Sequence, residues 1–226
     1  MCLSFEIREN VKNFLEEIPD NVELIAVTKT VNVDRIREAI NAGVKNIGEN
    51  KVQEALSKFD DLKDLKVKWH LIGRLQSNKA KKAVEIFDLI HSVDSIKLAN
   101  VLNKEAEKLS KVQEVLLQVN VSREETKTGF FVEDLITALP ELAKLDNLCI
   151  KGLMTIGIDT DDQSIMERCF KELKDLEKRV NMGKYLKRDL DILSMGMSND
   201  YKIAIAEGSN MIRLGRAIFG ERKMID

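Results

Sequence analysis

The sequence predicts an α/β protein, a single-domain TIM (β/α)8 barrel over residues 1–226 with an additional helix at its amino end. Short β-rich runs alternate with longer amphipathic segments, eight such runs occur, and 226 residues suit the short end of this fold's range. An open doubly wound sheet is the alternative. That fold usually has a glycine-rich turn after its first strand, where this chain has Thr28-Lys29-Thr30. We therefore favour the barrel.

Hydrophobic periodicity places the elements. Apolar residues at helical spacing from Leu3 to Ile18 predict the opening helix, and Gly43 ends the helix that follows the first strand. Further helices are predicted over residues 96–109 and 163–180, the second with an apolar stripe along one side. The predicted strands cover residues 22–28, 45–48, 67–72, 89–93, 115–121, 148–156, 191–194 and 211–214.

Composition narrows the classes of partner. The formal net charge is −2 with 33% charged residues, so no basic excess indicates nucleic acid or an acidic membrane surface. No apolar run approaches the roughly 20 residues that span a bilayer, and the amino end does not have the pattern of a signal peptide. Cys2, Cys149 and Cys169 form no CxxC pair and are typical of reduced thiols. We therefore expect a cytoplasmic protein.

Lys29 directly follows the first predicted strand, on the same face as Ile25 and Val27. Chemistry in this fold takes place at the carboxyl ends of the strands. A lysine desolvated there favours its neutral, nucleophilic form, which can form a Schiff base with a carbonyl. A solvated lysine at the start of a loop is the alternative, and position alone favours it.

The segments after the seventh and eighth strands predict a phosphate site, because these loops commonly hold phosphate in a TIM barrel. Glycines allow backbone N–H groups to approach an anion closely, and the start of a helix favours negative charge. The candidate ligands are Gly196, Met197, Ser198, Gly215 and the backbone of Arg216. Ordinary turn formation is the alternative.

Arg213 lies between Ile212 and Leu214, whose alternation turns Arg213 into the barrel. An unpaired cation is unfavourable there, so Arg213 requires a carboxylate, a phosphate or a ring nitrogen as its partner. A structural ion pair with Glu207 or Asp191 is equally compatible with the pattern.

Other polar residues give weaker signals. Gln118 and Asn120 share a face with Leu116, Asn50 ends the second strand, and His70 lies within the third. Such groups are most often satisfied by their neighbours. His70 has no second His or Cys at ligand spacing, which disfavours a metal site. The run KAKK at residues 79–82 is more typical of a solvated helix face than of a nucleic-acid site.

Together these residues resemble the YggS/PROSC family, the pyridoxal phosphate homeostasis proteins, from about Val22 to Arg222. The matching segments are 26–30 (AVTKT), 48–50 (GEN) with 53–54, 69–79 (WHLIGRLQSNK), 91–94 (HSVD), 118–121 with 127–130, 152–154, 193–200 and 211–220.

The resemblance implies a barrel like the N-terminal domain of alanine racemase, with pyridoxal 5'-phosphate (PLP) held as a Schiff base on Lys29. It places Arg213 near the pyridine nitrogen, and Ser198, Gly215 and Arg216 at the phosphate. Many relatives have Ser or Thr where this chain has Arg216. A backbone contact survives that difference, whereas a side-chain hydroxyl contact does not.

The resemblance also implies a monomeric regulator or carrier in vitamin B6 balance, with apo PLP-dependent enzymes as expected recipients. Alanine racemases use two opposed acid/base groups, and one comes from a β-rich domain for which we expect no room here. We therefore expect no robust turnover. The alternatives are a weak racemase or Schiff-base lyase, with His70 or Tyr201 as its base, and a scaffold that binds no small ligand.

Overall fold

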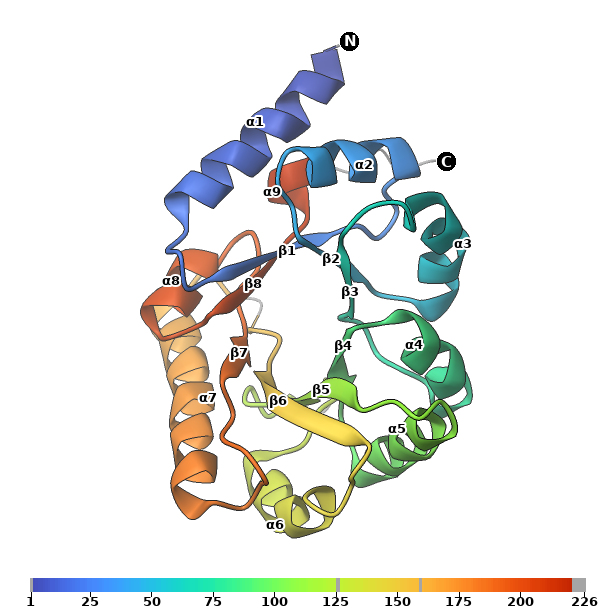
Figure 1. The fold of residues 1–226 in the computed structure, drawn as a ribbon. Coiled ribbons are helices and arrows are strands. Elements are labelled where there is room, and N and C mark those ends of the chain that lie inside the picture. Colours follow the sequence, from blue (N-terminus) through green and yellow to red (C-terminus); the bar gives the residue numbers. More distant parts are fainter. Residues whose placement is uncertain (1, 125–126, 159, 221–226) are drawn as a thin grey trace.

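The computed structural model describes residues 2–124, 127–158 and 160–220, and its strands close into one parallel barrel in chain order (Figure 1). In β8, Arg213 lies opposite Ile25 of β1, which closes the ring and excludes the open sheet. The strands are β1 Glu23–Val27, β2 Asn46–Glu49, β3 Lys68–Leu71, β4 Leu89–Val93, β5 Gln113–Gln118, β6 Leu148–Met154, β7 Ile192–Ser194 and β8 Met211–Leu214.

Helices surround the barrel, and the predicted additional helix is α1 (Figure 1). This helix packs on α2 and α9. Its Phe14 ring meets Tyr201 of α8 edge-on at 5.8 Å. The helices are α1 Cys2–Glu17, α2 Val33–Asn41, α3 Val52–Leu62, the 3-10 turn η1 Ser77–Lys79, α4 Ala80–Ile86, α5 Ile96–Lys108, α6 Val132–Leu142, α7 Gln163–Gly183, α8 Tyr201–Ala206 and α9 Arg216–Phe219.

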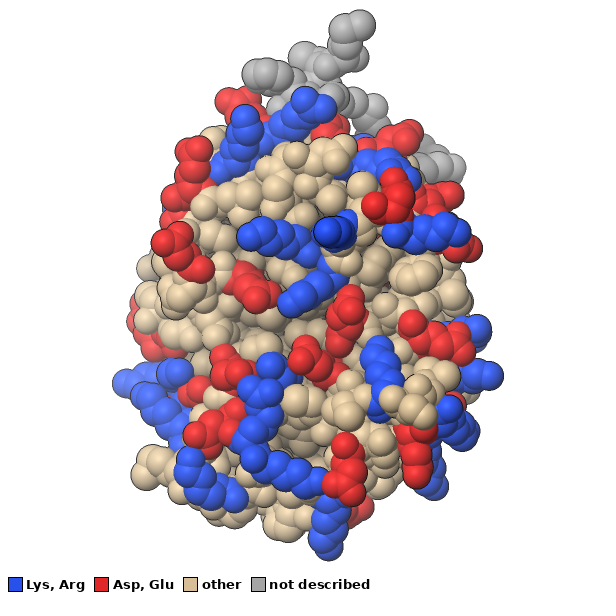
Figure 2. Space-filling view, viewed as in Figure 1, with Lys and Arg blue, Asp and Glu red and all other residues tan. Residues whose placement is uncertain are grey.

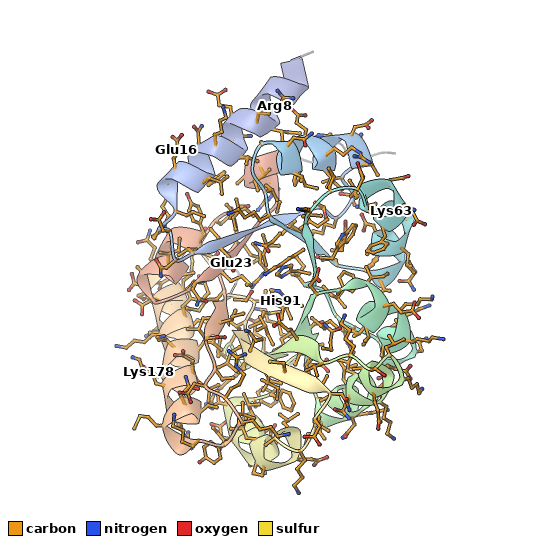
Figure 3. The ribbon with its side chains drawn as sticks, viewed as in Figure 1. Arg8, Glu16, Glu23, Lys63, His91 and Lys178 are labelled. Carbon is orange, nitrogen blue, oxygen red and sulfur yellow. The ribbon has the colours of Figure 1, made fainter. Side chains whose placement is uncertain are left out.

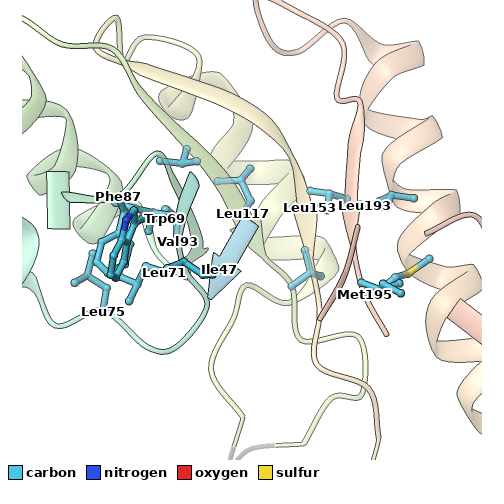
Figure 4. Packing of buried hydrophobic residues seen from close by; sticks show 14 of the residues in the cluster. Ile47, Trp69, Leu71, Leu75, Phe87, Val93, Leu117, Leu153, Leu193 and Met195 are labelled. Atoms are coloured by element: carbon cyan, nitrogen blue, oxygen red, sulfur yellow. The ribbon is translucent and has the colours of Figure 1, made fainter. Parts of the chain in front are cut away.

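Two apolar clusters hold the fold together. The larger one lies between the strands and the helices, where side chains such as Trp69, Phe87 and Leu153 interdigitate (Figure 4). The smaller one fills the inside of the barrel, as the inward-facing residues of a small barrel do. Its buried members are Ile25, Leu89, Leu116, Met154 and Met211.

The fifth strand ends earlier than the sequence predicts, at Gln118 instead of residue 121. The chain turns back on its own loop there, because Phe130 N donates to Gln118 O at 2.8 Å and Asn120 N donates to Phe130 O at 2.9 Å. The side-chain amides of Gln118 and Asn120 donate to the carbonyl oxygens of Glu124, Lys127 and Thr128 in this loop. Their neighbours therefore satisfy them.

Acidic and basic side chains are interspersed over the face shown in Figure 2, in line with the small net charge. No helix in the described part of the chain is long and apolar enough to cross a membrane. Cys149 and Cys169 are free thiols, and burial raises the pKa of Cys169 to about 11, which makes it unreactive at neutral pH. The side chain of Cys2 lies outside the described residues.

Gly152 marks the tightest contact between strands. A Cβ there would lie 1.9 Å from the Ile192 carbonyl oxygen of β7, and the register of β5 on β6 shifts beside it. We predict that Gly152→Ala lowers the free energy of unfolding by about 3 kcal/mol, because overpacking forces the strands apart. Urea denaturation measures the loss.

Gly220→Ala is the matched control. Gly220 has a φ of +75° and a ψ of −178°, a conformation almost restricted to glycine, with no atom within 4 Å of a Cβ, so only backbone strain changes, by about 1–3 kcal/mol. A loss below about 1 kcal/mol in Gly152→Ala would contradict the crowding argument.

Candidate functional site

The residues predicted for the site gather at one end of the barrel, because they lie at or just after the carboxyl ends of parallel strands. Lys29 follows β1, Asn50 follows β2 and His70 lies near the end of β3. The remaining members follow β7 or belong to β8 and the turn after it: Met197, Ser198, Arg213, Gly215 and Arg216.

Lys29 is half-buried, and both of its neighbours are fixed by hydrogen bonds. Thr28 N donates to Gly48 O at 2.9 Å, and Thr28 Oγ1 donates to Glu49 Oε1 at 2.7 Å. On the other side, Thr30 N donates to the Glu54 carboxylate of α3. Thr30 has a φ of +62°, a left-handed conformation that this contact helps to hold. The backbone that carries Lys29 is therefore rigid.

Lys58 of α3 organises these contacts. Its Nζ donates to Glu49 Oε1, to Glu54 Oε1 and to the Thr28 carbonyl oxygen, each at 2.8 Å. Glu49 is fully buried and Lys58 nearly so. Desolvation raises the pKa of Glu49, while the hydrogen bond and the charge of Lys58 oppose that rise. Lys58 therefore holds the segment around Lys29 in place, by its hydrogen bond to Thr28 and by binding the two carboxylates that contact Thr28 and Thr30.

Arg213 points into the barrel, as its alternation predicts, and begins a buried polar relay. Its Nη1 donates to Ser194 Oγ at 2.7 Å and to Ser194 O at 2.9 Å, and its Nη2 donates to Thr155 O at 2.9 Å. Ser194 Oγ lies 3.0 Å from His91 Nδ1, and His91 Nε2 lies 3.0 Å from His70 Nδ1. Figure 3 shows His91 near the centre of the ring of strands.

The order of donors assigns the protons along the relay. Arg213 only donates, so Ser194 Oγ accepts from it and keeps its own proton for His91 Nδ1. Neutral His91 then donates from Nε2 to His70 Nδ1, which leaves the proton of His70 on Nε2. That Nε2 is buried and has no hydrogen-bond partner within the described residues. A buried donor without an acceptor is unfavourable by about 1–3 kcal/mol.

Burial sets the protonation states of the relay. Desolvation lowers the pKa of His70 to about 3 and lowers that of His91 well below its ordinary value. Desolvation also lowers the pKa of Arg213 to about 10, although the negative charge of Asp200 raises it in part. At neutral pH the two histidines are therefore neutral and Arg213 is a cation.

The loops after β7 and β8 adjoin each other and the end of β1. Arg213 N donates to Gly196 O at 3.0 Å, and a Cβ on Gly215 would lie 3.4 Å from Val27 Cβ. Gly196 needs its φ of +97°, and Met197 N donates to Asp200 Oδ1 in a closed turn. Met197 and Arg216 are exposed, and Ser198 and Gly215 are half-buried.

Two alternatives from the sequence do not agree with this geometry. The contacts of Arg213 run to Ser194 and Thr155, while Asp191 pairs with Arg188 at 2.6 Å. Tyr201 fails as a base at the barrel mouth, because its hydroxyl donates to Glu17 of α1 at 2.9 Å, outside the barrel. Desolvation raises the pKa of Tyr201 as well.

Sequence reasoning left Lys58, Glu49, His91, Ser194 and Thr155 without a role. Their common signal is a polar residue within or beside an apolar strand, which is too frequent to single them out. His91 carries the strongest such signal, since it lies two positions after Leu89, which faces the barrel interior, and therefore faces inward as well. His70 and His91 meet in space although they are 21 positions apart. Among the described residues, no cluster of three His, Cys, Asp or Glu could hold a metal.

Comparison with known proteins shows the family. The model of the alanine racemase N-terminal domain matches residues 5–223. The pyridoxal phosphate homeostasis protein of Synechocystis sp. is 46% identical over 209 residues, which cover 91% of this chain and 94% of the relative. That of Aquifex aeolicus is 43% identical over 89% of this chain and 87% of its own length. This chain belongs to the pyridoxal phosphate homeostasis protein family.

Solved structures agree with this membership. PipY of Synechococcus elongatus, solved with PLP bound, has a TM-score of 0.89 and 40% identity over 95% of this chain and 100% of its own. An alanine racemase of Clostridium difficile has a TM-score of 0.80 at 15% identity, over 98% of this chain and 58% of its own. At that identity the likeness concerns the fold alone. The homeostasis-family barrel is thus the same fold as the barrel of the racemase.

Substitution of Lys58 should lower the stability of this homeostasis-family barrel more than substitution of an exposed lysine does. We predict that Lys58→Met lowers the free energy of unfolding by about 3–5 kcal/mol, because it leaves Glu49 buried without its cation. The double variant Lys58→Met/Glu49→Gln should recover part of the loss. Lys82→Met removes the half-exposed pair with Glu85 and should change stability by less than about 1 kcal/mol. Urea denaturation compares the three, and equal losses for both lysines would refute the role of Lys58.

The buried histidines make stability depend on pH. In the unfolded chain, His70 and His91 bind protons once the pH falls below their ordinary pKa of 6.5. In the folded barrel, His70 binds a proton only near pH 3, and the pKa of His91 is also well below its ordinary value. The unfolded state then binds more protons, so the free energy of unfolding falls as the pH decreases from about 6.5. The limit is about 1.4 kcal/mol per pH unit for each histidine.

Urea denaturation between about pH 7 and pH 5.5 measures this slope. We expect His70→Gln to flatten it, because one of the two depressed groups is gone. Lys68, Arg213 and Ser194 stay in place in that variant and keep the surroundings of His91 constant. An unchanged slope would show that the histidines are not the source.

Proposed function

We propose that this chain binds PLP as a Schiff base on Lys29 and acts in intracellular PLP homeostasis without robust catalytic turnover. The observation that carries the proposal is the buried relay from Arg213 to His70, whose last donor has no partner among the described residues. Arg213 lies opposite Ile25, four positions before Lys29 on the same strand face. The homeostasis proteins that resemble this chain and the PLP-bound PipY support the ligand class.

The residues present fit each part of the cofactor. Lys29 offers an amine for the aldehyde, from a backbone held by Thr28 and Thr30. The contacts of Arg213 use three of its five N–H groups, which leaves donor capacity for the ring nitrogen. His70 Nε2 offers a donor to a ring acceptor. Asn50 lies at the same end of the barrel, directly after β2. The turns with Ser198, Gly215 and Arg216 N–H would hold the phosphate, beside Met197.

Bound PLP supplies a conjugated ring that can accept electrons from an attached amino acid. Arg213 limits this capacity, because a guanidinium that remains protonated at neutral pH donates to the ring nitrogen and keeps that atom unprotonated. Neutral His70 holds its donor through the relay of His91 and Ser194. These groups bind and orient the ring and do not activate it.

The acid/base groups also favour a carrier over an enzyme. Efficient proton transfer needs a group with a pKa near the working pH. The pKa of His70 is about 3, and the Tyr201 hydroxyl is directed to Glu17 outside the barrel. The relatives are named as homeostasis proteins, which agrees with this assignment. We propose a cytoplasmic monomer with apo PLP-dependent enzymes as recipients of the cofactor.

The test is the visible absorbance of purified protein mixed with PLP, followed by borohydride reduction and peptide mass mapping. We expect a Schiff-base band, a reduced adduct on Lys29, and loss of both in Lys29→Ala. Lys82→Ala, an exposed lysine on α4, is the control and should keep the band. Label scattered over surface lysines, or a band that persists in Lys29→Ala, would overturn the Lys29 assignment.

Turnover decides between carrier and enzyme. The PLP-loaded protein is incubated with single amino acids, and racemisation, keto-acid release and decarboxylation are followed by chiral chromatography. Rates below about 1 per second, the lower end of the common range for enzymes, would support the carrier. Rates within that range that disappear in Lys29→Ala would refute it and favour the racemase or lyase.

A further inference from the structure

A cavity whose lining does not include Lys29 opens between the ends of β2, β3 and β4. Its volume is about 610 Å³, within the range of pockets that hold small molecules. None of the residues assigned to PLP above lines this cavity, although Asn50 and His70 also lie at β2 and β3, so the function proposed there leaves the cavity unexplained. Three segments that matched the family, 48–54, 69–79 and 91–94, meet at this cavity.

The wall of the cavity is cationic. Four basic side chains line it against one carboxylate, Asp94. None of the four has an ion pair within 4.0 Å in the described part of the chain, whereas the nearby Lys82 pairs with Glu85 at 2.7 Å. Like charges that gather in excess over counter-charges attract an anion. The four are Lys51, Arg74, Lys79 and Lys97.

Helix starts add to this field. Val52 and Gln53, the first residues of the 11-residue α3, line the cavity, as do Lys97 and Leu98 in the first turn of the 13-residue α5. The N-cap residue of α3, Lys51, makes no side-chain cap, so the first N–H groups of α3 lack that acceptor. At α5 the Ser95 hydroxyl caps Leu98 N, so only α3 offers uncapped N–H groups here. The dipoles of both helices favour negative charge, such as that of a phosphate, at this position.

The loop that carries Arg74 is firmly seated. A Cβ on Gly73 would lie 2.3 Å from the Asn50 carbonyl oxygen, so only glycine permits this approach of the two loops. On the other side, Leu75 is buried and packs beside Trp69, Leu71 and Phe87 (Figure 4). Arg74 is therefore presented from a fixed backbone, as a built binding site requires.

The remaining lining indicates more than an inorganic anion. Val52, Leu75 and Leu98 provide a buried apolar floor, and Asp94 can accept hydrogen bonds from a ligand hydroxyl or amino group. The volume also exceeds what one phosphate ion fills. We propose that this cavity binds a phosphorylated ring compound, a nucleotide or a similar phosphate ester, with its phosphate at the cations and its ring on the apolar floor.

One of the lysines was expected to be solvated. The sequence favours a solvated helix face for residues 79–82, and Lys81 and Lys82 are exposed as expected. Lys79, in contrast, is half-buried and lines the cavity. This division supplies a matched control, since Lys81 and Lys82 carry the same charge a few residues away without lining the cavity.

The test is isothermal titration calorimetry with ADP, adenosine and PLP. ADP is titrated into protein with and without PLP, and PLP into Lys29→Ala, so the result does not depend on the Lys29 assignment. We expect saturable 1:1 binding of ADP, or of PLP in Lys29→Ala, which weakens as salt increases. Arg74→Gln/Lys97→Gln should weaken that binding at least tenfold, while Lys81→Gln/Lys82→Gln should leave it unchanged.

The two phosphorylated probes distinguish the source of the phosphate ester. Binding of ADP indicates a nucleotide, and binding of PLP alone to Lys29→Ala indicates a second pyridoxal site if Arg74→Gln/Lys97→Gln weakens it. Either result supports the proposal, whereas PLP binding that the cavity variant leaves unchanged belongs to the first site and does not. The proposal is overturned if neither probe binds, if adenosine binds as tightly as ADP, or if the Lys81/Lys82 variant loses as much affinity as the cavity variant. The four substituted side chains are exposed and the half-buried Lys79 is left intact, so both variants should fold.

Discussion

The contact of Lys58 with Glu49, Glu54 and Thr28 is the interaction on which the arrangement of the mouth depends. A charged pair inside a protein is tolerated only when hydrogen bonds compensate both partners for lost water. Here the ammonium group has three acceptors at 2.8 Å, and one of them is the carbonyl of the residue before Lys29. The same cluster joins β1, β2 and α3, so the position of Lys29 and the packing of the barrel are set together.

A second constraint is the polar layer inside the barrel. Apolar residues such as Leu89 and Met211 fill the interior, and Arg213, Ser194, His91 and His70 form the layer nearer the carboxyl ends of the strands. Burial keeps both histidines neutral, and neutrality gives the relay one direction, from the guanidinium to His70 Nε2. A layer of this kind stabilises the fold poorly by itself. Its unsatisfied end is best explained by a ligand.

The mouth has two sides with different character. Around β1, β7 and β8, glycine turns and the buried Arg213 lie near Lys29. Around β2, β3 and β4, exposed cations surround an open cavity and the starts of two helices. Arg74 also borders a smaller hollow of about 330 Å³ with Gln118 and Asn120 on the β5 side. We therefore propose that one barrel end holds a covalently bound cofactor and a freely exchanging anion next to each other.

The sequence by itself determined the barrel, its order of elements and the inward direction of Arg213, because periods of 2 and 3.6 residues are local properties of the chain. It also placed Lys29 and the two turns at strand ends, where this fold carries its chemistry. Only the tertiary structure decided which polar residues meet. The contact of His70 with His91, the charge of Lys58 against Glu49, and the approach of Gly73 to Asn50 join different strands and helices. Their pairing depends on barrel register and on burial, and a linear pattern contains neither.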